Sequence, residues 1–292
     1  MEFAQFTQYL FTGLTIGSIY ALLAIGFVTI YNTTGILNFA QGEFVMIGAL
    51  TTISLINMGL PMAVAMIGAI LITALLGFVI EKSIINPARN TSIVTLIVIT
   101  IGLSIFLKGM GLIIWGTYPK TLSPVISKGS ISFMGAVINS QSLFIFGVLI
   151  IMLISLYVFF DKTFIGSALK ASEKNPRAAS LMGINIKTMS ALSFTLAAAL
   201  GAIAGIIITP LTDATYDMGF FIGLKGFVAM VIGGMNSVSG VVMGGLLLGV
   251  VESFSAGLFS STYSDAITFG VLLLVLFFRP IGLFARASGE RV

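Results

Sequence analysis

A few charged side chains lie in or beside long apolar stretches of the sequence, where a charge is energetically unfavourable. These are the residues that could do chemistry. Glu43, Lys225 and Glu252 each lie within or beside a long apolar run, and Lys108 lies toward the outer end of another. A charge at the centre of a membrane-spanning helix costs roughly 2.5–3.5 kcal/mol. Such a residue therefore forms a structural ion pair or serves a transport pathway. For Lys108 we expect the long side chain to reach the membrane interface instead.

Other kinds of chemistry are excluded by missing residues. The chain contains no His and no Cys, so it cannot form a Ser-His-Asp triad, an HExxH site, a zinc-thiolate site or a disulfide. It also lacks the GxxxxGK[ST] loop that binds nucleotide phosphates, so we do not expect it to hydrolyse ATP by itself. We expect no enzymatic activity, no cofactor and no metal.

The composition is that of a membrane protein. Of the 292 residues 58% are hydrophobic and 8% are charged, and the mean hydropathy is +1.13. Soluble domains carry about a quarter charged residues, so most of this surface must face lipid. The composition excludes a soluble enzyme, a disordered chain and a nucleic-acid binder. We expect one all-α transmembrane domain over residues 1–292.

The elements that must position these charges are apolar helices. A bilayer core of about 30 Å needs roughly 20 apolar residues in a helix. Eight runs meet this requirement and a ninth, shorter run does not, which predicts about eight to nine transmembrane segments, with prolines at the segment ends. The full runs are 9–31, 38–57, 62–80, 91–115, 141–160, 189–209, 238–258 and 264–280, and the short one is 219–234.

Basic residues predict the orientation, because cytoplasmic loops are enriched in Lys and Arg. The stretch 161–187 has five bases and two acids, and the loop 81–90 and the C-terminal tail are also basic. The stretch 209–221 carries only Asp213 and Asp217, which favours the outside. Lys120 and Lys128 are weak evidence against this orientation, because they place two bases in a loop predicted to lie outside. In that loop, 130–133 and 136–139 resemble an external hairpin. If 219–234 crosses the membrane, the number of crossings is odd, and the N-terminus is outside and the C-terminus cytoplasmic. If 219–234 is re-entrant, the number of crossings is even and this assignment no longer holds.

Glycines recur four residues apart in several of the spans. Examples are Gly13 with Gly17 and Gly245 with Gly249. Small residues at this spacing let helices approach closely in lipid, so we expect these glycines to form packing seams.

A weak internal repeat relates the segment that begins at Phe39 to the one that begins at Phe221. In each, a Phe precedes a charge by four residues (Glu43 or Lys225), and an apolar run then ends in Gly. Inverted repeats with interrupted helices are common in transporters.

The basic stretch 161–188 is too polar to span the membrane. Asn175 and Pro176 predict the start of a short helix, with Asn175 as the N-cap, and Gly183 predicts its end. A short helix pair at the membrane face could dock a soluble partner. The alternative is an interfacial helix held by anionic lipid.

Together these stretches resemble the permease subunits of ABC importers for branched-chain amino acids, of the LivH type. The match includes Asn38-Phe-Ala-Gln-Gly-Glu43, where Gln41 replaces the usual His and so removes a titratable group. It includes the loop from Gly166 to Asn185, where Lys170 replaces the usual Arg. It also includes Gly17 to Gly26 and the region from Lys225 through Glu252 to Phe284, and so covers nearly the whole chain.

The resemblance implies an inverted-repeat permease in the cell inner membrane that forms half of a pathway for leucine, isoleucine and valine. Its partners would be a homologous second permease, two cytoplasmic ATPase subunits and an extracytoplasmic substrate-binding protein. Asn38, Gln41, Glu43, Lys225 and Glu252 would lie near the pathway. The loop 161–188 would couple to the ATPases through Gly166, Ala168, Lys170, Ala171, Asn175, Ala178, Ala179, Gly183, Ile184 and Asn185.

Two alternatives stay open at this point. One is an ABC permease for another small polar cargo, such as urea, amides or other amino acids. The other is a secondary transporter or channel that uses Glu43, Lys225 and Glu252 for gating. A secondary transporter has no need of a docking element at 161–188.

Overall fold

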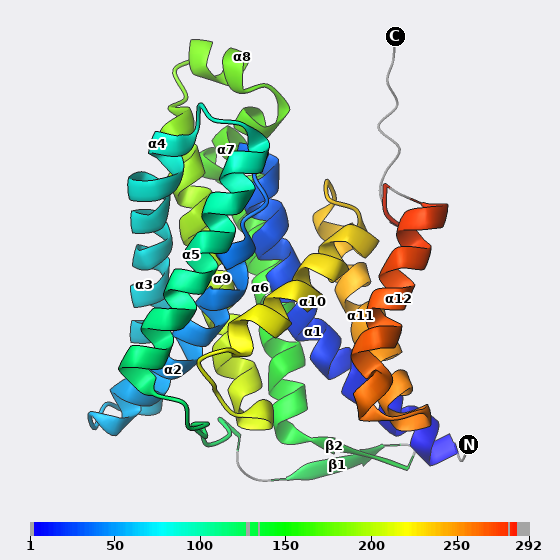
Figure 1. Ribbon diagram of the computed structural model, residues 1–292. Helices are drawn as coiled ribbons and strands as arrows, with labels where there is room; N and C mark the ends of the chain where they lie inside the picture. Colours follow the sequence, from blue (N-terminus) through cyan, green and yellow to red (C-terminus); the bar gives the residue numbers. More distant parts are fainter. Residues whose placement is uncertain (1–2, 127–128, 134, 280, 285–292) are drawn as a thin grey trace.

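A computed structural model describes residues 3–126, 129–133, 135–279 and 281–284 (Figure 1). The described residues form an all-α bundle with one small hairpin. Lys128, Pro280 and the tail residues Arg286, Glu290 and Arg291 lie outside the described residues. The membrane-length helices, with any helical extension, are α1 (Phe3–Thr34), 3₁₀ helix η1 with α2 (Phe39–Gly42, Glu43–Asn57), α3 with π-helix η2 and α4 (Met62–Ile80, Glu81–Ile85, Asn86–Ala88), α5 (Ile93–Trp115), α6 (Ser140–Lys162), α9 (Ile186–Thr212), α11 (Val238–Leu258) and α12 (Ser261–Phe278).

These eight segments are long and apolar enough to cross a membrane, and they agree with the eight predicted runs to within a few residues at most ends. The largest differences are at α1, which begins six residues earlier, and at α3, whose helix continues through a basic segment to Ala88. The hairpin strands β1 (Ser130–Phe133) and β2 (Ala136–Asn139) occupy the predicted positions and pair antiparallel.

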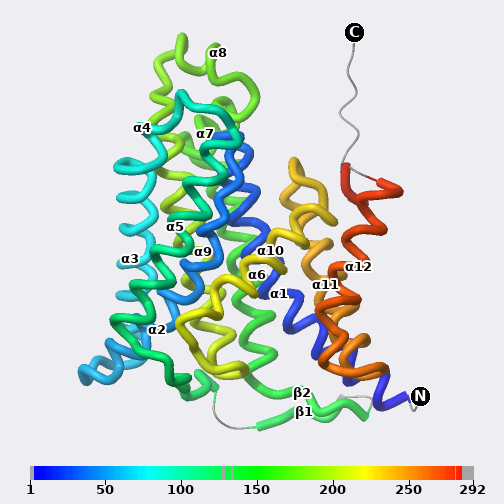
Figure 2. The backbone as a smooth tube through the Cα atoms, viewed as in Figure 1, coloured from blue at the N-terminus to red at the C-terminus, as the bar shows by residue number. Residues whose placement is uncertain are grey.

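The short segment α10 (Met218–Gly233) crosses the bundle obliquely. Figures 1 and 2 show α9 and α11 running in the same direction, with α10 returning the chain between them. Its 16 residues rise about 24 Å, less than a bilayer core of about 30 Å. A short helix is tolerated here because α10 packs against protein, in contact with α1, α2, α11 and α12. With this crossing counted, α1 begins and α12 ends at opposite ends of the bundle (Figure 1).

Two of the prolines predicted at segment ends lie just inside the last turn of a helical segment. Pro210 lies inside α9, two residues before its end. Pro87 lies in α4, which continues the α3 helix beyond the π-helical turn Glu81–Ile85. A π-helical turn widens the backbone locally, which relieves the clash between a proline ring and the carbonyl group one turn earlier.

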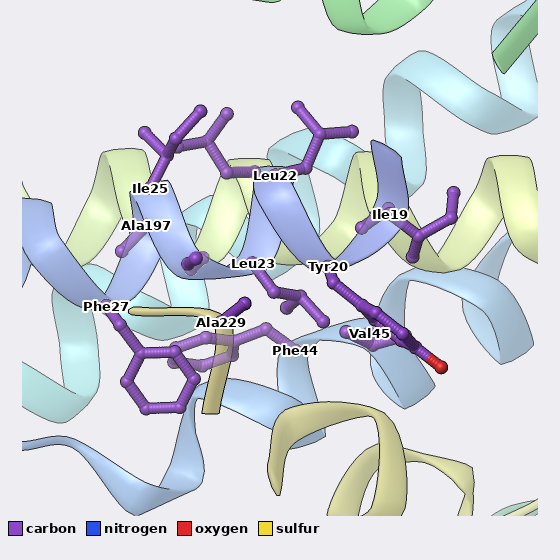
Figure 3. Packing of buried hydrophobic residues seen from close by; sticks show 14 of the residues in the cluster. Ile19, Tyr20, Leu22, Leu23, Ile25, Phe27, Phe44, Val45, Ala197 and Ala229 are labelled. Carbon is purple, nitrogen blue, oxygen red and sulfur yellow. The ribbon is translucent and has the colours of Figure 1, made fainter. Parts of the chain in front are cut away.

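The centre of the bundle is α1. Its residues from Gly17 to Ile30 are all buried, as expected of a helix that is apolar on every side. Figure 3 shows Leu22 and Ile25 leaving α1 on one side and Leu23 and Phe27 on the other. The helices that pack most extensively around it, α9, α10 and α11, all come from the second half of the chain.

The predicted glycine seams are present, and two of them face each other. A methyl group added to Gly17 in α1 would lie 2.8 Å from the Gly245 carbonyl oxygen in α11. One added to Gly13 would lie 2.8 Å from the carbonyl oxygen of Gly249. The two backbones are therefore in direct contact, and only glycine permits this approach.

Candidate functional site

Glu43 is a fully buried carboxylate at the break between η1 and α2. It is the first residue of α2, and its Oε1 accepts a hydrogen bond of 2.9 Å from the Ser104 hydroxyl of α5. Its Oε2 is buried without a hydrogen-bond partner among the described residues. A methyl group on Gly219, in the first turn of α10, would lie 2.7 Å from this Oε2. The start of α10 therefore lies directly against a buried and incompletely satisfied charge.

The residues just before Glu43 point to other elements. The Asn38 side chain caps η1 by accepting a hydrogen bond from the Ala40 backbone N–H (3.2 Å). The Gln41 amide donates a 2.8 Å hydrogen bond to the Ala197 carbonyl of α9. Asn38 Nδ2 and Gln41 Oε1 are buried without partners among the described residues. The three residues are thus neighbours in sequence that do not form one converging site.

The break at η1 also touches α10 backbone to backbone. A methyl group on Gly223 would lie 2.7 Å from the Cα of Gly42. These are the two segments related by the internal repeat, and they run in opposite directions in the bundle (Figure 2). No side chain separates the two backbones at this pair of glycines, and beside them the rings of Phe39 in η1 and Phe227 in α10 lie 5.6 Å apart, centre to centre.

Lys225, at the middle of α10, bonds two carboxylates. Its Nζ lies 2.6 Å from Glu252 Oε1 in α11 and 2.9 Å from Asp265 Oδ1 in α12. The Tyr20 hydroxyl of α1 donates a 2.8 Å hydrogen bond to Glu252 Oε2. Lys225 and Glu252 are about 15% exposed, and the Asp265 side chain is 56% exposed. The network ties four helices together and ends at an accessible carboxylate.

The structure therefore separates the charges that the sequence singled out. Lys225 and Glu252 form an ion pair with each other, whereas Glu43 bonds Ser104 and has no ion pair among the described residues. Lys108 lies near the ring of Tyr216, with its Nζ 5.8 Å from the ring centre. Sequence reasoning missed Asp265, although it is a charge inside the predicted run 264–280. Ser104 and Tyr20 gave no signal that could have identified them.

The stretch 161–188 folds as predicted. It contains α7 (Phe164–Lys174) and α8 (Pro176–Leu181), which project from one end of the bundle (Figure 1). The Asn175 side chain accepts a 3.0 Å hydrogen bond from the Ala178 N–H, and Asn185 caps α9 in the same way. Gly183 has a φ of +87°, a conformation that ends α8 and favours glycine.

The residues of this stretch divide into two groups. Gly166, Ala168 and Ala179 are buried; the Gly166 backbone packs on Phe159 and Phe160, so these small residues seat the two helices on the bundle. Lys170, Ala171 and Ile184 are partly exposed, whereas Asn175, Ala178, Gly183 and Asn185 are exposed. The most exposed apolar side chains of this stretch are Leu181, the last residue of α8, at 88%, Phe164 at the start of α7, at 86%, and Met182 at 83%.

Comparison with known proteins identifies the family. Residues 9–276 match the family described as the permease component of branched-chain amino acid transport systems. The chain belongs to this family. It is 34% identical to the permease protein BraD of the high-affinity branched-chain amino acid transport system of Pseudomonas aeruginosa, over 100% of this chain and 99% of BraD. It is 33% identical, with the same coverage, to the corresponding permease LivH of Escherichia coli K12.

The fold has a counterpart among solved structures. A chain of PsaBC from Streptococcus pneumoniae, solved in complex with a Fab, superposes with a TM-score of 0.50 at 16% identity, over 94% of this permease and 91% of that chain. At this identity the likeness concerns the fold alone. The chain is thus a multi-pass membrane permease of the ABC transporter class with an all-α fold.

Proposed function

We propose that this permease imports leucine, isoleucine and valine, and forms half of a pathway completed by a homologous second permease. Two cytoplasmic ATPase subunits would supply the energy and an extracytoplasmic binding protein would deliver the cargo. Its relatives are named for transport of these amino acids. The observation that carries the proposal is the α7–α8 pair, a capped and exposed element that a self-sufficient transporter does not need.

In this proposal α8 docks on an ATPase subunit. Leu181 and Met182 are too exposed to contribute to the core of the permease, and an apolar tip that projects from the spans is typical of a protein interface. The same end of the bundle carries α4, which lies between the basic residues Lys82 and Arg89 in the sequence, and this supports a cytoplasmic location. The N-terminus would then be outside and the C-terminus cytoplasmic.

Charged replacements at the tip test this docking. The double variant Leu181→Asp, Met182→Asp is expected to lose co-purification of the ATPase subunits and to lower leucine uptake at least tenfold, since interface anchors contribute about 2 kcal/mol or more. Met58→Asp is the matched control, because Met58 is 77% exposed at the opposite end of the bundle. Retention of the ATPases by the double variant would overturn the proposal. Competition of leucine uptake by urea or short amides, but not by isoleucine or valine, would reassign the cargo.

We also propose that the pathway passes the contact between η1 and α10, near Asn38, Gln41, Glu43, Lys225 and Glu252. The glycine-to-glycine contact of Gly42 and Gly223 would be its closed gate. The unpartnered Oε2 of Glu43 supports this proposal, because buried carboxylates without full hydrogen bonding are rare, and ionisable residues inside membrane spans often mark a transport pathway.

Glu43→Gln separates charge from shape at this position. The amide keeps the size of the side chain and an acceptor for Ser104, so we expect normal amounts of folded protein and at least tenfold slower leucine uptake, a change of about 1.4 kcal/mol. Ser104→Ala is the control for the hydrogen bond alone and is expected to have the smaller effect. Uptake and membrane abundance would be measured in the same cells. Equal losses of both in Glu43→Gln would make Glu43 a structural residue.

A further inference from the structure

A cavity of about 510 Å³ lies at the end of the bundle that carries α7, between α1, α6, α7 and α11. Its walls are apolar over most of their length. They are formed by Val28 of α1, Leu153, Leu156 and Phe160 of α6, and Val242 and Met243 of α11. The cavity contains none of the residues of the Lys225 network or of the contact between η1 and α10. It is therefore a separate candidate site.

Charged groups line the cavity at the α7 end. Lys170 Nζ is bonded to the Asp161 carboxylate, and both line the cavity with Glu173. Glu173 has no ion pair of its own among the described residues, so the three lining charges sum to −1. Burial raises the pKa of the Glu173 carboxyl, and Lys170 and Lys174 oppose this rise. Lys174 does not line the cavity. An occupant that brings a cation would neutralise this rim.

The first turn of α11 contributes a partial positive charge to the cavity, opposite in sign to the rim formed by Asp161 and Glu173. Val238 and Ser239 line the cavity, and Ser237 caps the helix by accepting a 3.1 Å hydrogen bond from the Gly240 N–H. The first N–H groups of a helix have no acceptor within it, and its start carries a partial positive charge. This end of the wall therefore favours a phosphate group over a second cation.

We propose that this cavity binds a phospholipid whose headgroup carries a primary ammonium, as in phosphatidylethanolamine. The acyl chain would lie along the apolar walls, the ammonium would meet Asp161 and Glu173, and the phosphate would meet Ser239 and the start of α11. The negative rim disfavours an anionic lipid, and the predominantly apolar walls favour a chain of CH₂ groups.

Such a lipid would connect α7, the helix that precedes α8, to α11. Leu169, Lys170 and Glu173 of α7 line one side of the cavity, and Val242 of α11 lines the other. Among the described residues, α7 and α11 do not pack extensively against each other. The occupant would thus fix how α7 sits on the bundle. Lipid binding at this cavity does not depend on which cargo the permease carries. A negative result for the lipid would therefore leave the proposed transport function unaffected.

Lipid retention tests the proposal directly. The full chain would be purified from nanodiscs containing equal amounts of phosphatidylethanolamine and phosphatidylglycerol, and bound lipid would be counted by native mass spectrometry. We expect retention of the ethanolamine lipid, and at least about tenfold weaker retention in the double variant Asp161→Asn, Glu173→Gln, because the variant removes both carboxylates that would meet the ammonium. Met243→Trp, which places a larger side chain at the half-exposed edge of the cavity, should also release the lipid.

Ile151→Trp is the matched control, because Ile151 is an exposed α6 residue that does not line the cavity. It should retain the lipid as the wild type does. Equal retention of both lipids, or retention of leucine in place of lipid, would overturn the proposal. So would full retention of the ethanolamine lipid by both cavity variants.

Discussion

Lys225→Met is expected to abolish leucine uptake and to lower the stability of the permease by about 3–5 kcal/mol, the cost of leaving a buried charge without its partner. Glu252 is 14% exposed and bonds Lys225 at 2.6 Å, so among the described residues the substitution leaves its carboxylate with the Tyr20 hydroxyl as its one hydrogen-bond partner. The Met side chain keeps most of the volume of the Lys stem. A loss of folded protein in detergent, measured by fluorescence-detected size exclusion, would therefore report the missing charge.

A second substitution separates stability from transport. In Lys225→Met, Glu252→Gln no charge remains in the buried part of the network, and Asp265, which is 56% exposed, can stay hydrated. We expect the double variant to recover folded protein but not leucine uptake, in keeping with the proposed place of Lys225 beside the pathway. Recovery of both would make the network purely structural. If Lys225→Met is as stable as the wild type, the ion pair contributes nothing to stability.

The helices were predictable because their signals are local. A run of apolar residues long enough to span lipid must be helical, since no other open structure satisfies its backbone there. The ends of several helices could be predicted from single residues. Pro61 directly precedes α3, Asn175 caps the start of α8, and Gly183 follows its end. The continuation of α3 to Ala88 was missed, because a proline and charged residues normally indicate a boundary and the π-helical turn that absorbs Pro87 has no sequence signature.

The pairing of the charges was not predictable, because it depends on contacts between distant helices. The internal repeat placed Glu43 and Lys225 at equivalent positions, yet equivalent positions in an inverted repeat need not touch. Lys225 instead meets Glu252 and Asp265, 27 and 40 residues further along the chain. Which face of α11 and α12 turns toward α10 is set by packing, and the apolar runs around these charges carry almost no periodic signal.

The exposed end of α8 is a second feature that could be predicted only in part from the sequence. The sequence indicated a short amphipathic helix near Ala178 and Ala179, and a helix is present there. It did not show which side would be covered. The fold buries Ala179 and leaves Leu181 and Met182 outside. The residues proposed for docking are thus the apolar ones that the fold leaves exposed, and the packing of α8 identifies them.

The second large effect is expected at the α1–α11 seam. Gly17→Ala should lower the melting temperature of the purified permease, because the added methyl group would lie 2.8 Å from backbone atoms of Gly245 and Leu246. Backbone atoms cannot move aside as a flexible side chain can, so the two helices must separate. Overpacking of this kind costs about 1–3 kcal/mol, and Gly17→Leu should exceed that range because α1 is the centre of the core.

Gly102→Ala and Gly102→Leu provide the matched comparison. Gly102 is exposed on α5 and a methyl group there would meet nothing within 4 Å, so both changes should improve helix propensity, and the larger side chain can extend away from the bundle. The seam variants should lose stability in proportion to side-chain size, whereas the Gly102 variants should match or exceed the wild type. If both positions respond alike, the effect of glycine is on the helix itself and not on the approach of the backbones. A graded loss at Gly17 alone would show that direct contact between α1 and α11 holds the two halves of the repeat together.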